Sequence, residues 1–326
     1  MIRIPAPSRF LVPWIALLAA LAAPAQAQPA YPVKPIQLIV GYAAGGGTDL
    51  LARVVAGKMA EGLGQPVVIE NKVGAQSIIA AQYVAKANPD GYTLLLGPSG
   101  PMSMNPAIYS KLPYAPLRDF APVSLLGSFP LILAVGQHHP AKSVQELVAY
   151  AKANPEKSNY GASAAPFQLA AELFKQKTGT AFQHIAYKGS NESVNATATG
   201  EVTMTLADPP PLVGQVKAGR VRALAISTPA RHPAWPDVPT LRESGLADMD
   251  IALWTGILAP AGTPAPVIRR LQEEIARVLK LPEVRERIVA LGIDPTGSTP
   301  EEFARVIGAD ITKWTAVAKA ANIKAD

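Results

Sequence analysis

Residues 36–49 read Ile36-Gln37-Leu38-Ile39-Val40-Gly41-Tyr42-Ala43-Ala44-Gly45-Gly46-Gly47-Thr48-Asp49, a β-branched apolar run followed by a glycine-rich segment. Apolar residues then recur at helical spacing from Leu50 to Leu63, which predicts a strand, a loop and a helix in succession. The pattern continues with a strand at Val67–Ile69, a helix at Ser77–Lys86 and a strand at Thr93–Leu96. This β-α-β-α-β order is typical of a parallel sheet with right-handed crossovers.

The alternation of strand and helix patterns repeats further along the chain. The apolar segment Val123–Val135 leads out of the first unit. Beyond it we expect strands at 182–187, 202–207 and 222–227 and helices at 167–177, 190–199 and 212–218. Capping boxes predict helix starts at Ser143 and Thr299. We therefore expect two α/β lobes, the first at residues 28–128 and 255–326 and the second at 129–254.

The N-terminus has the three parts of a secretory signal peptide. Arg3 and Arg9 precede the apolar run Leu11–Ala23, and Ala25-Gln26-Ala27 forms an A-x-A cleavage site. A membrane anchor is the alternative, but the run is shorter than the ~20 apolar residues that a spanning helix needs. We expect export across the inner membrane, cleavage after Ala27 and a periplasmic location.

Composition excludes several classes of protein. The chain has no cysteine, so it cannot carry a lipid on an N-terminal Cys, and its 49% hydrophobic residues are ordinary for a globular protein. The formal charge of +6 is spread along the chain, without a basic block interleaved with aromatics. A nucleic-acid surface would need such a block, so we expect no nucleic-acid partner.

Motifs for catalysis, metals and cofactors are missing. The four histidines do not have H-E-x-x-H spacing, no carboxylate cluster suggests a metal site, and no G-x-S-x-G elbow is present. The glycines match neither G-x-x-x-x-G-K-S/T nor G-x-G-x-x-G. We therefore expect no catalytic residue, no metal and no cofactor, and a protein that is not an enzyme.

The glycine-rich segment 41–49 is the first candidate for ligand binding. It lies beyond the carboxyl end of a predicted strand, where open parallel sheets bind their ligands. Glycines allow close approach of the backbone, and free N–H groups at the start of the next helix favour an anion. The other interpretation, that the glycines only make a tight turn, is about as strong.

Six motifs in the same order resemble the substrate receptors of tripartite tricarboxylate transporters, often called Bug proteins. They cover essentially the whole chain after residue 27 and stand at 41–53, 88–94, 105–106, 186–190, 236–240 and 258–264. The resemblance implies a two-lobed periplasmic-binding-protein (Venus-flytrap) fold, each lobe a mostly parallel sheet flanked by helices. It also implies a cleft between the lobes that holds a carboxylate, largely through backbone groups.

Carried over by position, the resemblance implies a set of ligand-binding residues in both lobes. In the first lobe they are Tyr42, Ala43, Gly46, Gly47, Asp49, Gly74, Ala75, Gln76, Ser77 and Ser99, and in the second Ser163, Tyr187, Lys188, Gly189 and Asp208. Two of these assignments have alternatives at this stage. Asp208 could instead cap the helix that follows it, and Lys188 could be an ordinary exposed lysine.

Two segments depart from the family pattern, both on the expected ligand side. Residues 73–80 read Val-Gly-Ala-Gln-Ser-Ile-Ile-Ala where the family has a stretch like P-G-A-G-G-x-x-G, and Gln168 stands where many relatives have a histidine. These changes favour a ligand with an apolar or aromatic body, or they are family drift without effect on the ligand. Trp254 is a candidate for the cleft wall, although packing in the core or hinge is the stronger interpretation.

The predicted function is that of a periplasmic solute-binding protein. It would capture a small aliphatic or aromatic carboxylate and deliver it to membrane subunits of a tripartite tricarboxylate-type transporter, and we expect a monomer. The alternative is a carboxylate receptor that acts mainly as a sensor for a two-component signalling system, since both roles use the closed, loaded form.

Overall fold

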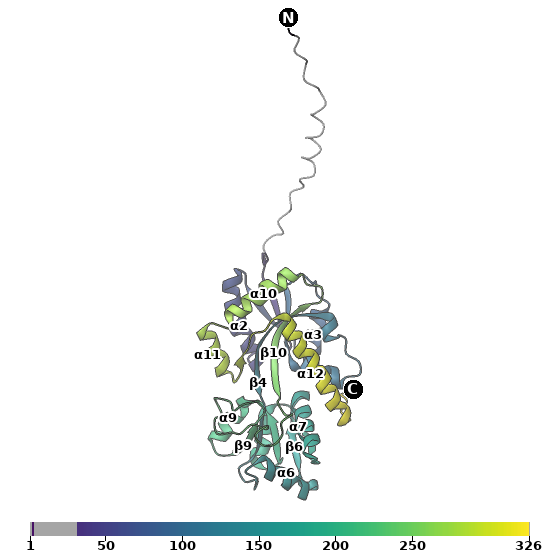
Figure 1. The fold of residues 1–326 in the computed structure, drawn as a ribbon, viewed down its shortest axis with the longest axis vertical. Coiled ribbons are helices and arrows are strands. Elements are labelled where there is room, and N and C mark those ends of the chain that lie inside the picture. Colours follow the sequence, from purple (N-terminus) through teal and green to yellow (C-terminus); the bar gives the residue numbers. More distant parts are fainter. Residues whose placement is uncertain (1, 3–30, 326) are drawn as a thin grey trace.

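The computed structural model describes residue 2 and residues 31–325. Two lobes, each a β-sheet with helices packed against it, follow one another along the long axis of the molecule (Figure 1). The predicted two-lobed α/β fold is thus confirmed. The predicted signal peptide, residues 1–27, lies outside the described residues except for Ile2. Within the described part of the chain, no helix combines the length and apolar character needed to cross a membrane.

The first lobe is built on a six-stranded sheet in the order β11-β4-β10-β3-β1-β2. Its strands are β1 (Ile36–Val40), β2 (Val67–Asn71), β3 (Thr93–Pro98), β4 (Phe120–Pro130), β10 (Ala252–Pro260) and β11 (Asp294–Pro295). Alternate side chains of β1 point to opposite faces. Ile36, Leu38 and Val40 pack with α2 (Gly47–Leu63), α10 (Ala265–Val278) and α11 (Pro282–Ala290). Ile39 packs on the other face with α3 (Ile78–Ala85) and α12 (Pro300–Ala320).

The second lobe is built on a five-stranded sheet in the order β7-β6-β8-β5-β9. Its strands are β5 (Ile132–Gly136), β6 (Asn159–Ala162), β7 (Gln183–Ala186), β8 (Met204–Ala207) and β9 (Val221–Ile226). The helices α6 (Val144–Ala153) and α7 (Ala165–Thr178) cover one face, and α8 (Ser190–Thr199) and α9 (Pro209–Lys217) the other. Short helical segments complete the chain: η1 (Ala75–Ser77), η2 (Gly100–Met104), α4 (Asn105–Ile108), α5 (Pro116–Asp119) and η3 (Pro155–Lys157).

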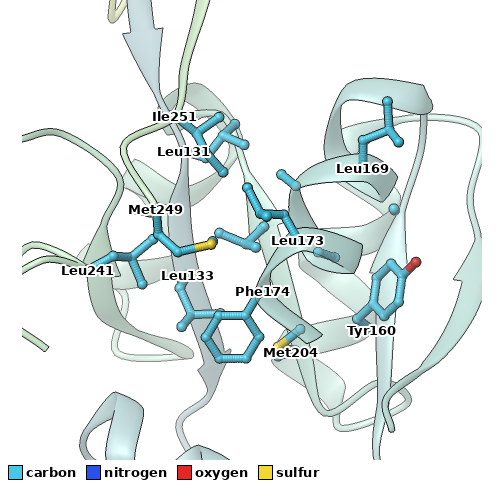
Figure 2. Close-up of a cluster of buried hydrophobic side chains, with 14 of the residues drawn as sticks. Leu131, Leu133, Tyr160, Leu169, Leu173, Phe174, Met204, Leu241, Met249 and Ile251 are labelled. Carbon is cyan, nitrogen blue, oxygen red and sulfur yellow. The ribbon is translucent and has the colours of Figure 1, made fainter. Parts of the chain in front are cut away.

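The core of the second lobe is closed by residues from distant parts of the chain (Figure 2). Leu133 of β5 and Phe174 of α7 pack in one cluster with Met249, which lies in the long connection after β9. Tyr160 is fully buried in the same cluster, and its hydroxyl donates a hydrogen bond to Glu172 Oε1 at 2.7 Å. The one polar group of this large side chain is therefore satisfied, as burial requires.

Both sheets are mixed, whereas we expected them to be mostly parallel. Parallel pairing joins β1 to β2 and β3, and β6 to β7 and β8. The strands β4, β10 and β5 run antiparallel to their neighbours. The reason is connectivity: β4 leaves the first lobe and β10 returns to it, so that the two strands must run in opposite directions. The four-residue strand β6 and the two-residue strand β11 had no clear pattern in the sequence.

The two capping boxes differ in detail. Thr299 and Glu302 form the complete reciprocal box that was predicted, with Pro300 at the first helical position. At α6 the Ser143 hydroxyl accepts the Glu146 N–H, but the Glu146 carboxylate accepts the N–H of Lys142 rather than that of Ser143. Both helices begin where the sequence predicted.

The antiparallel pair β4–β10 carries the chain between the lobes. Its register runs from Phe120 opposite Pro260 to Pro130 opposite Ala252. At its end Ser227, after β9, joins both strands: its Oγ accepts the Leu131 N–H at 2.8 Å and donates to the carbonyl of Ile251. Backbone hydrogen bonds from Ser227 N to Leu131 O and from Ile251 N to Ser227 O complete the junction. The lobes are thus linked by two ordered strands.

Helix α12 connects the lobes on one side of this crossing. It begins against the first sheet and ends beside α7, on the opposite side of the crossing from α9 and α11 (Figure 1). Trp314 and Val317 of its second half are buried in the core cluster of the second lobe, together with Met104 and Ile108 of the first. This apolar seam holds one side of the interlobe region shut. The side that carries α9 and α11 is where a cleft can form.

Candidate functional site

The loop before α2 ends in a helix N-terminus without a side-chain cap. Gly46 occupies the N-cap position with φ −74° and ψ 163°, and no side chain accepts a hydrogen bond from the first turn. The loop turns at Gly45, whose φ of +81° favours glycine. Gly46 N–H donates to Ala43 O at 3.3 Å. The first N–H groups of a helix have no partner within the helix, so this end of α2 suits an anion.

Asp49 holds this loop in shape. Its fully buried carboxylate accepts four hydrogen bonds: from Gly45 N–H (2.9 Å), from Arg53 Nε (2.8 Å) and Nη2 (3.1 Å), and from Asn71 Nδ2 (2.9 Å). Asn71 Nδ2 also donates to the carbonyl of Tyr42. The Arg53 hydrogen bonds lower the pKa of Asp49 to about 2. Both oxygens are thus occupied by the protein, which gives Asp49 a positioning role behind the loop.

The neighbouring loop, residues 74–77, has an unusual backbone. Ala75, Gln76 and Ser77 have φ values of +44°, +52° and +68°, a region that costs roughly 1–2 kcal/mol for a residue with a Cβ. A Cβ on Gly41 would overlap Ser77 Oγ, so the two loops touch. The side-chain amide of Asn105 donates to Gln76 O at 3.2 Å. These contacts hold the loop in a backbone conformation that is unfavourable for residues with a Cβ.

The remaining first-lobe candidates lie around these two loops. The Tyr42 ring is half-buried, and burial raises the pKa of its hydroxyl to about 12. That hydroxyl would be 3.4 Å from a Cβ on Gly100, the first residue of η2. Ser99 is buried just before η2, where its carbonyl accepts from Ser103 Oγ at 2.8 Å. Ala43 is exposed.

In the second lobe the candidates surround the N-terminus of α8. Gly189 is the N-cap of α8 with no side-chain cap, and Ser163 Oγ lies 3.4 Å from Ser190 Oγ. The Tyr187 hydroxyl donates to Glu201 Oε1 at 2.8 Å, and Lys188 is exposed. The N-termini of α2 and α8, each with a glycine at the N-cap position, thus come from opposite lobes.

Asp208 stands at the N-cap position of α9 but does not cap it. Residues 209–211 are all proline, so the first turn of α9 has no N–H to offer a capping side chain. Instead the carboxyl group hydrogen-bonds Ser190, and its buried Oδ1 has no partner among the described atoms. Burial raises the pKa of Asp208 above its ordinary value of 3.8. The capping interpretation is thus wrong.

A cavity of about 670 Å³ lies between the lobes on the side away from α12. A smaller one of about 140 Å³ adjoins it, and both are lined by Gly47, Asp208 and Pro210. Gly189 and Ser190 of α8 also line the larger cavity. At its edge His232 Nε2 lies 2.9 Å from Asp294 Oδ1 and 3.1 Å from Oδ2. This pair joins the connection after β9 to β11 of the first lobe.

The structure brings three of the predicted binding residues, Gly47, Gly189 and Asp208, to this cleft. The other twelve line neither of the two cavities. Sequence reasoning missed the wall made by His232, Trp235 and residues 289–294. No local motif marks that wall, because its parts come together only through the fold. Within the residues described, no group of three or more His, Cys, Asp or Glu side chains could hold a metal ion.

Trp254 is a core residue, as the stronger interpretation held. It is buried, its ring packs edge-to-face on Phe303 with centroids 5.2 Å apart, and its Nε1 donates to Asp310 Oδ2 at 2.6 Å. It therefore stabilises the packing of β10 against α12 rather than facing a ligand.

Comparison with known proteins settles the family. Residues 51–323 match the family described as tripartite tricarboxylate transporter family receptor. The chain belongs to this family. The resemblance found in the sequence is thereby confirmed, and because this is a family of solute-binding receptors, this receptor is not an enzyme.

Relatives of this receptor match over nearly their whole length. The protein BugT of Bordetella pertussis is 36% identical over 94% of each chain. A structure from R. palustris with adipate has a TM-score of 0.79 and 35% identity, covering 90% of this chain and 99% of that one. MatC from Rhodopseudomonas palustris, with bound malate, has a TM-score of 0.76 and 32% identity over 88% and 99%.

Replacing Asp49 tests its positioning role. Asp49→Ala leaves the Gly45 N–H and Arg53 without this acceptor and Asn71 with the Tyr42 carbonyl alone, so we expect a loss of about 1–3 kcal/mol of unfolding free energy near neutral pH. Because the folded pKa is depressed, the contribution is present above the ordinary value of 3.8 and disappears as the pH falls through about 2. Chemical denaturation of both proteins at several pH values measures this, with the exposed Asp237→Ala as control. An equal stability of the Asp49→Ala and Asp237→Ala proteins would contradict the role.

The raised pKa of Asp208 predicts that its contribution to stability changes with pH in the opposite direction to that of Asp49. Its pKa is raised, so stability is lost as the pH rises from 3.8 through the folded pKa. Asp208→Asn should therefore stabilise the protein near neutral pH and have little effect near pH 3.

The same change removes a negative charge beside the cleft, and we expect the affinity for a dicarboxylate to rise on the order of tenfold at neutral pH. Calorimetric titration measures this; an unchanged or lower affinity of Asp208→Asn would contradict the expected repulsion between the Asp208 carboxylate and the ligand.

Proposed function

We propose that this receptor captures a small carboxylate between its lobes in the periplasm and delivers it to the membrane subunits of a tripartite tricarboxylate-type transporter. In this proposal residues 1–27 direct export and are cleaved after Ala27, and the receptor acts as a monomer. The observation that carries the proposal is the convergence of two glycine-capped helix N-termini, α2 and α8, on one interlobe cavity.

The helix termini supply what a carboxylate needs. Each uncapped N-terminus attracts an anion by about 0.3–1 kcal/mol when exposed and up to ~2 kcal/mol when partly buried. Gly47 and Gly189 have no side chain that would keep carboxylate oxygens from the backbone, and a Cβ at either would meet open space. Charge-assisted N–H bonds then add to the dipole attraction. The bound adipate and malate of the two R. palustris relatives support this choice of ligand class.

The same placement explains how a ligand would favour closure. A carboxylate that touches α2 in one lobe and α8 in the other binds the closed form better than the open form, and so increases its population. The β4–β10 crossing and Ser227 provide the hinge, and the His232–Asp294 contact adds a direct link across the cleft. The loaded receptor would thus present one defined shape to its membrane partner.

Binding can be tested by blocking the helix termini. Gly47→Val should weaken binding of carboxylates such as adipate at least tenfold, because the new side chain occupies the approach to the α2 amides. Gly189→Val should do the same from the second lobe. Calorimetric titration measures affinity, and the neutral diamide of adipate tests the requirement for negative charge.

Gly57→Val is the matched control for these variants. Gly57 lies in the same helix as Gly47, is exposed, and also has open space where a Cβ would stand. The Gly57→Val variant should bind carboxylates as tightly as the original receptor does. Full binding by Gly47→Val, or equal binding of the diamide and the diacid, would refute the carboxylate site.

The proposed role in transport can be tested by measuring carboxylate uptake in cells. Deletion of the gene should reduce uptake of the bound carboxylate by tenfold or more, and the full-length gene should restore it. A gene lacking codons 2–27 should fail to restore uptake, because its product would stay inside the cell. Radiolabelled uptake measures this. Normal uptake with lost induction of transport genes would instead assign the receptor to signalling.

A further inference from the structure

The interlobe cavity has an apolar half that a short dicarboxylate would leave unfilled. Its volume of about 670 Å³ is within the range of pockets that take drug-sized ligands. Beyond Gly47 and Gly189, its walls include Leu50, Trp235 and Val289. These side chains come from α2, from the connection after β9 and from α11, so that both lobes contribute.

Three of these wall residues are large apolar side chains that remain exposed. Leu50, Val213 and Val289 have exposed fractions of 38%, 36% and 53%. Single exposed apolar side chains are ordinary on protein surfaces. Here three of them, from three different helices, line one concave surface together with Trp235. Convergence of this kind in a hollow is typical of a ligand pocket.

The helix starts that line the cavity differ in chemistry. At α2 and α8 the N-cap residue is glycine, so no side chain caps the first backbone N–H groups. At α9 the first turn consists of Pro209, Pro210 and Pro211, which have no N–H and present only ring methylenes. An anion therefore has donors at the first two helices and none at the third. Because the Asp208 carboxyl group already hydrogen-bonds Ser190 at the start of α8, the start of α2 suits an acid group best, and the apolar side chains of α9 and α11 suit an apolar group.

We propose that this apolar half is a subsite for the body of the ligand, so that the receptor selects carboxylates with an aromatic or similarly bulky apolar group. The inference rests on the proposed carboxylate function and names its substrate class. The acid group lies against the start of α2, and the apolar body lies against Val213 of α9 and Val289 of α11. Trp235 offers a flat apolar surface, on which an aromatic ring packs well.

The proposal predicts a dependence of affinity on the length of the apolar body. Each methylene that becomes buried strengthens binding about fourfold. Butyrate, hexanoate and 3-phenylpropionate, titrated into the purified receptor, should therefore bind with increasing affinity, and 3-phenylpropionate at least tenfold more tightly than butyrate. Succinate and adipate serve as acids without an apolar end.

Variants of the wall separate the subsite from the acid site. Val289→Asn places a polar group on α11 and should weaken binding of hexanoate and 3-phenylpropionate about fivefold, while it leaves butyrate and succinate within twofold. Val213→Asn should act in the same way from α9. Val68→Asn is the matched control, because Val68 is 51% exposed on β2 and lines neither interlobe cavity. Thermal unfolding of each variant checks that the fold is retained.

The outcomes distinguish this inference from the function on which it rests. Flat affinity along the series, or an equal effect of Val289→Asn on short and long acids, overturns the subsite; binding of succinate or adipate would then still support a carboxylate receptor. Failure of every acid to bind overturns both proposals. Chain-length dependence that is lost in Val289→Asn and kept in Val68→Asn supports the subsite.

Discussion

The antiparallel pairing of β4 with β10 is the constraint on which the arrangement of the two lobes depends. Two hydrogen-bonded strands, tied at their end to Ser227, allow the lobes to rotate about the crossing but not to separate. The pairing also explains the mixed sheets, since a chain that leaves a lobe and returns must place opposite strand directions side by side. The strands of the first lobe come from both sides of this crossing, so that lobe is built from two pieces of chain, whereas the strands of the second lobe lie in one.

The crossing has two unlike sides, and this asymmetry determines where a ligand can enter. On one side the second half of α12 buries Trp314 among residues of both lobes, and hydrophobic packing of this kind is costly to open. On the other side exposed apolar side chains line the cavity between the lobes, and the partly exposed His232–Asp294 contact links the lobes. A contact between partly exposed groups contributes little. Opening therefore costs far less on the side of α9 and α11, where the cavity lies.

The sequence predicted well what depends on local patterns. The strand at residues 36–40 and the helix α8 at 190–199 have the expected bounds, and Thr299 begins a helix through the expected capping box. It predicted poorly what depends on residues distant in the chain. The local pattern did not reveal that the Asp49 carboxylate accepts a hydrogen bond from Asn71, on the neighbouring strand. The wall formed by His232 and Asp294 joins segments 62 residues apart and has no local signature.

The loop at residues 75–77 is a case in which tertiary contacts overrule local preference. Three consecutive residues with a Cβ adopt a left-handed backbone that glycine would adopt more easily. The missing Cβ at Gly41 makes room for Ser77, and Asn105 holds the carbonyl of Gln76. The loop therefore adopts this left-handed backbone with residues that carry a Cβ, and local strain results. Strain of this order persists only where the surroundings determine it fully, which makes this loop a rigid neighbour for the glycine-rich loop before α2.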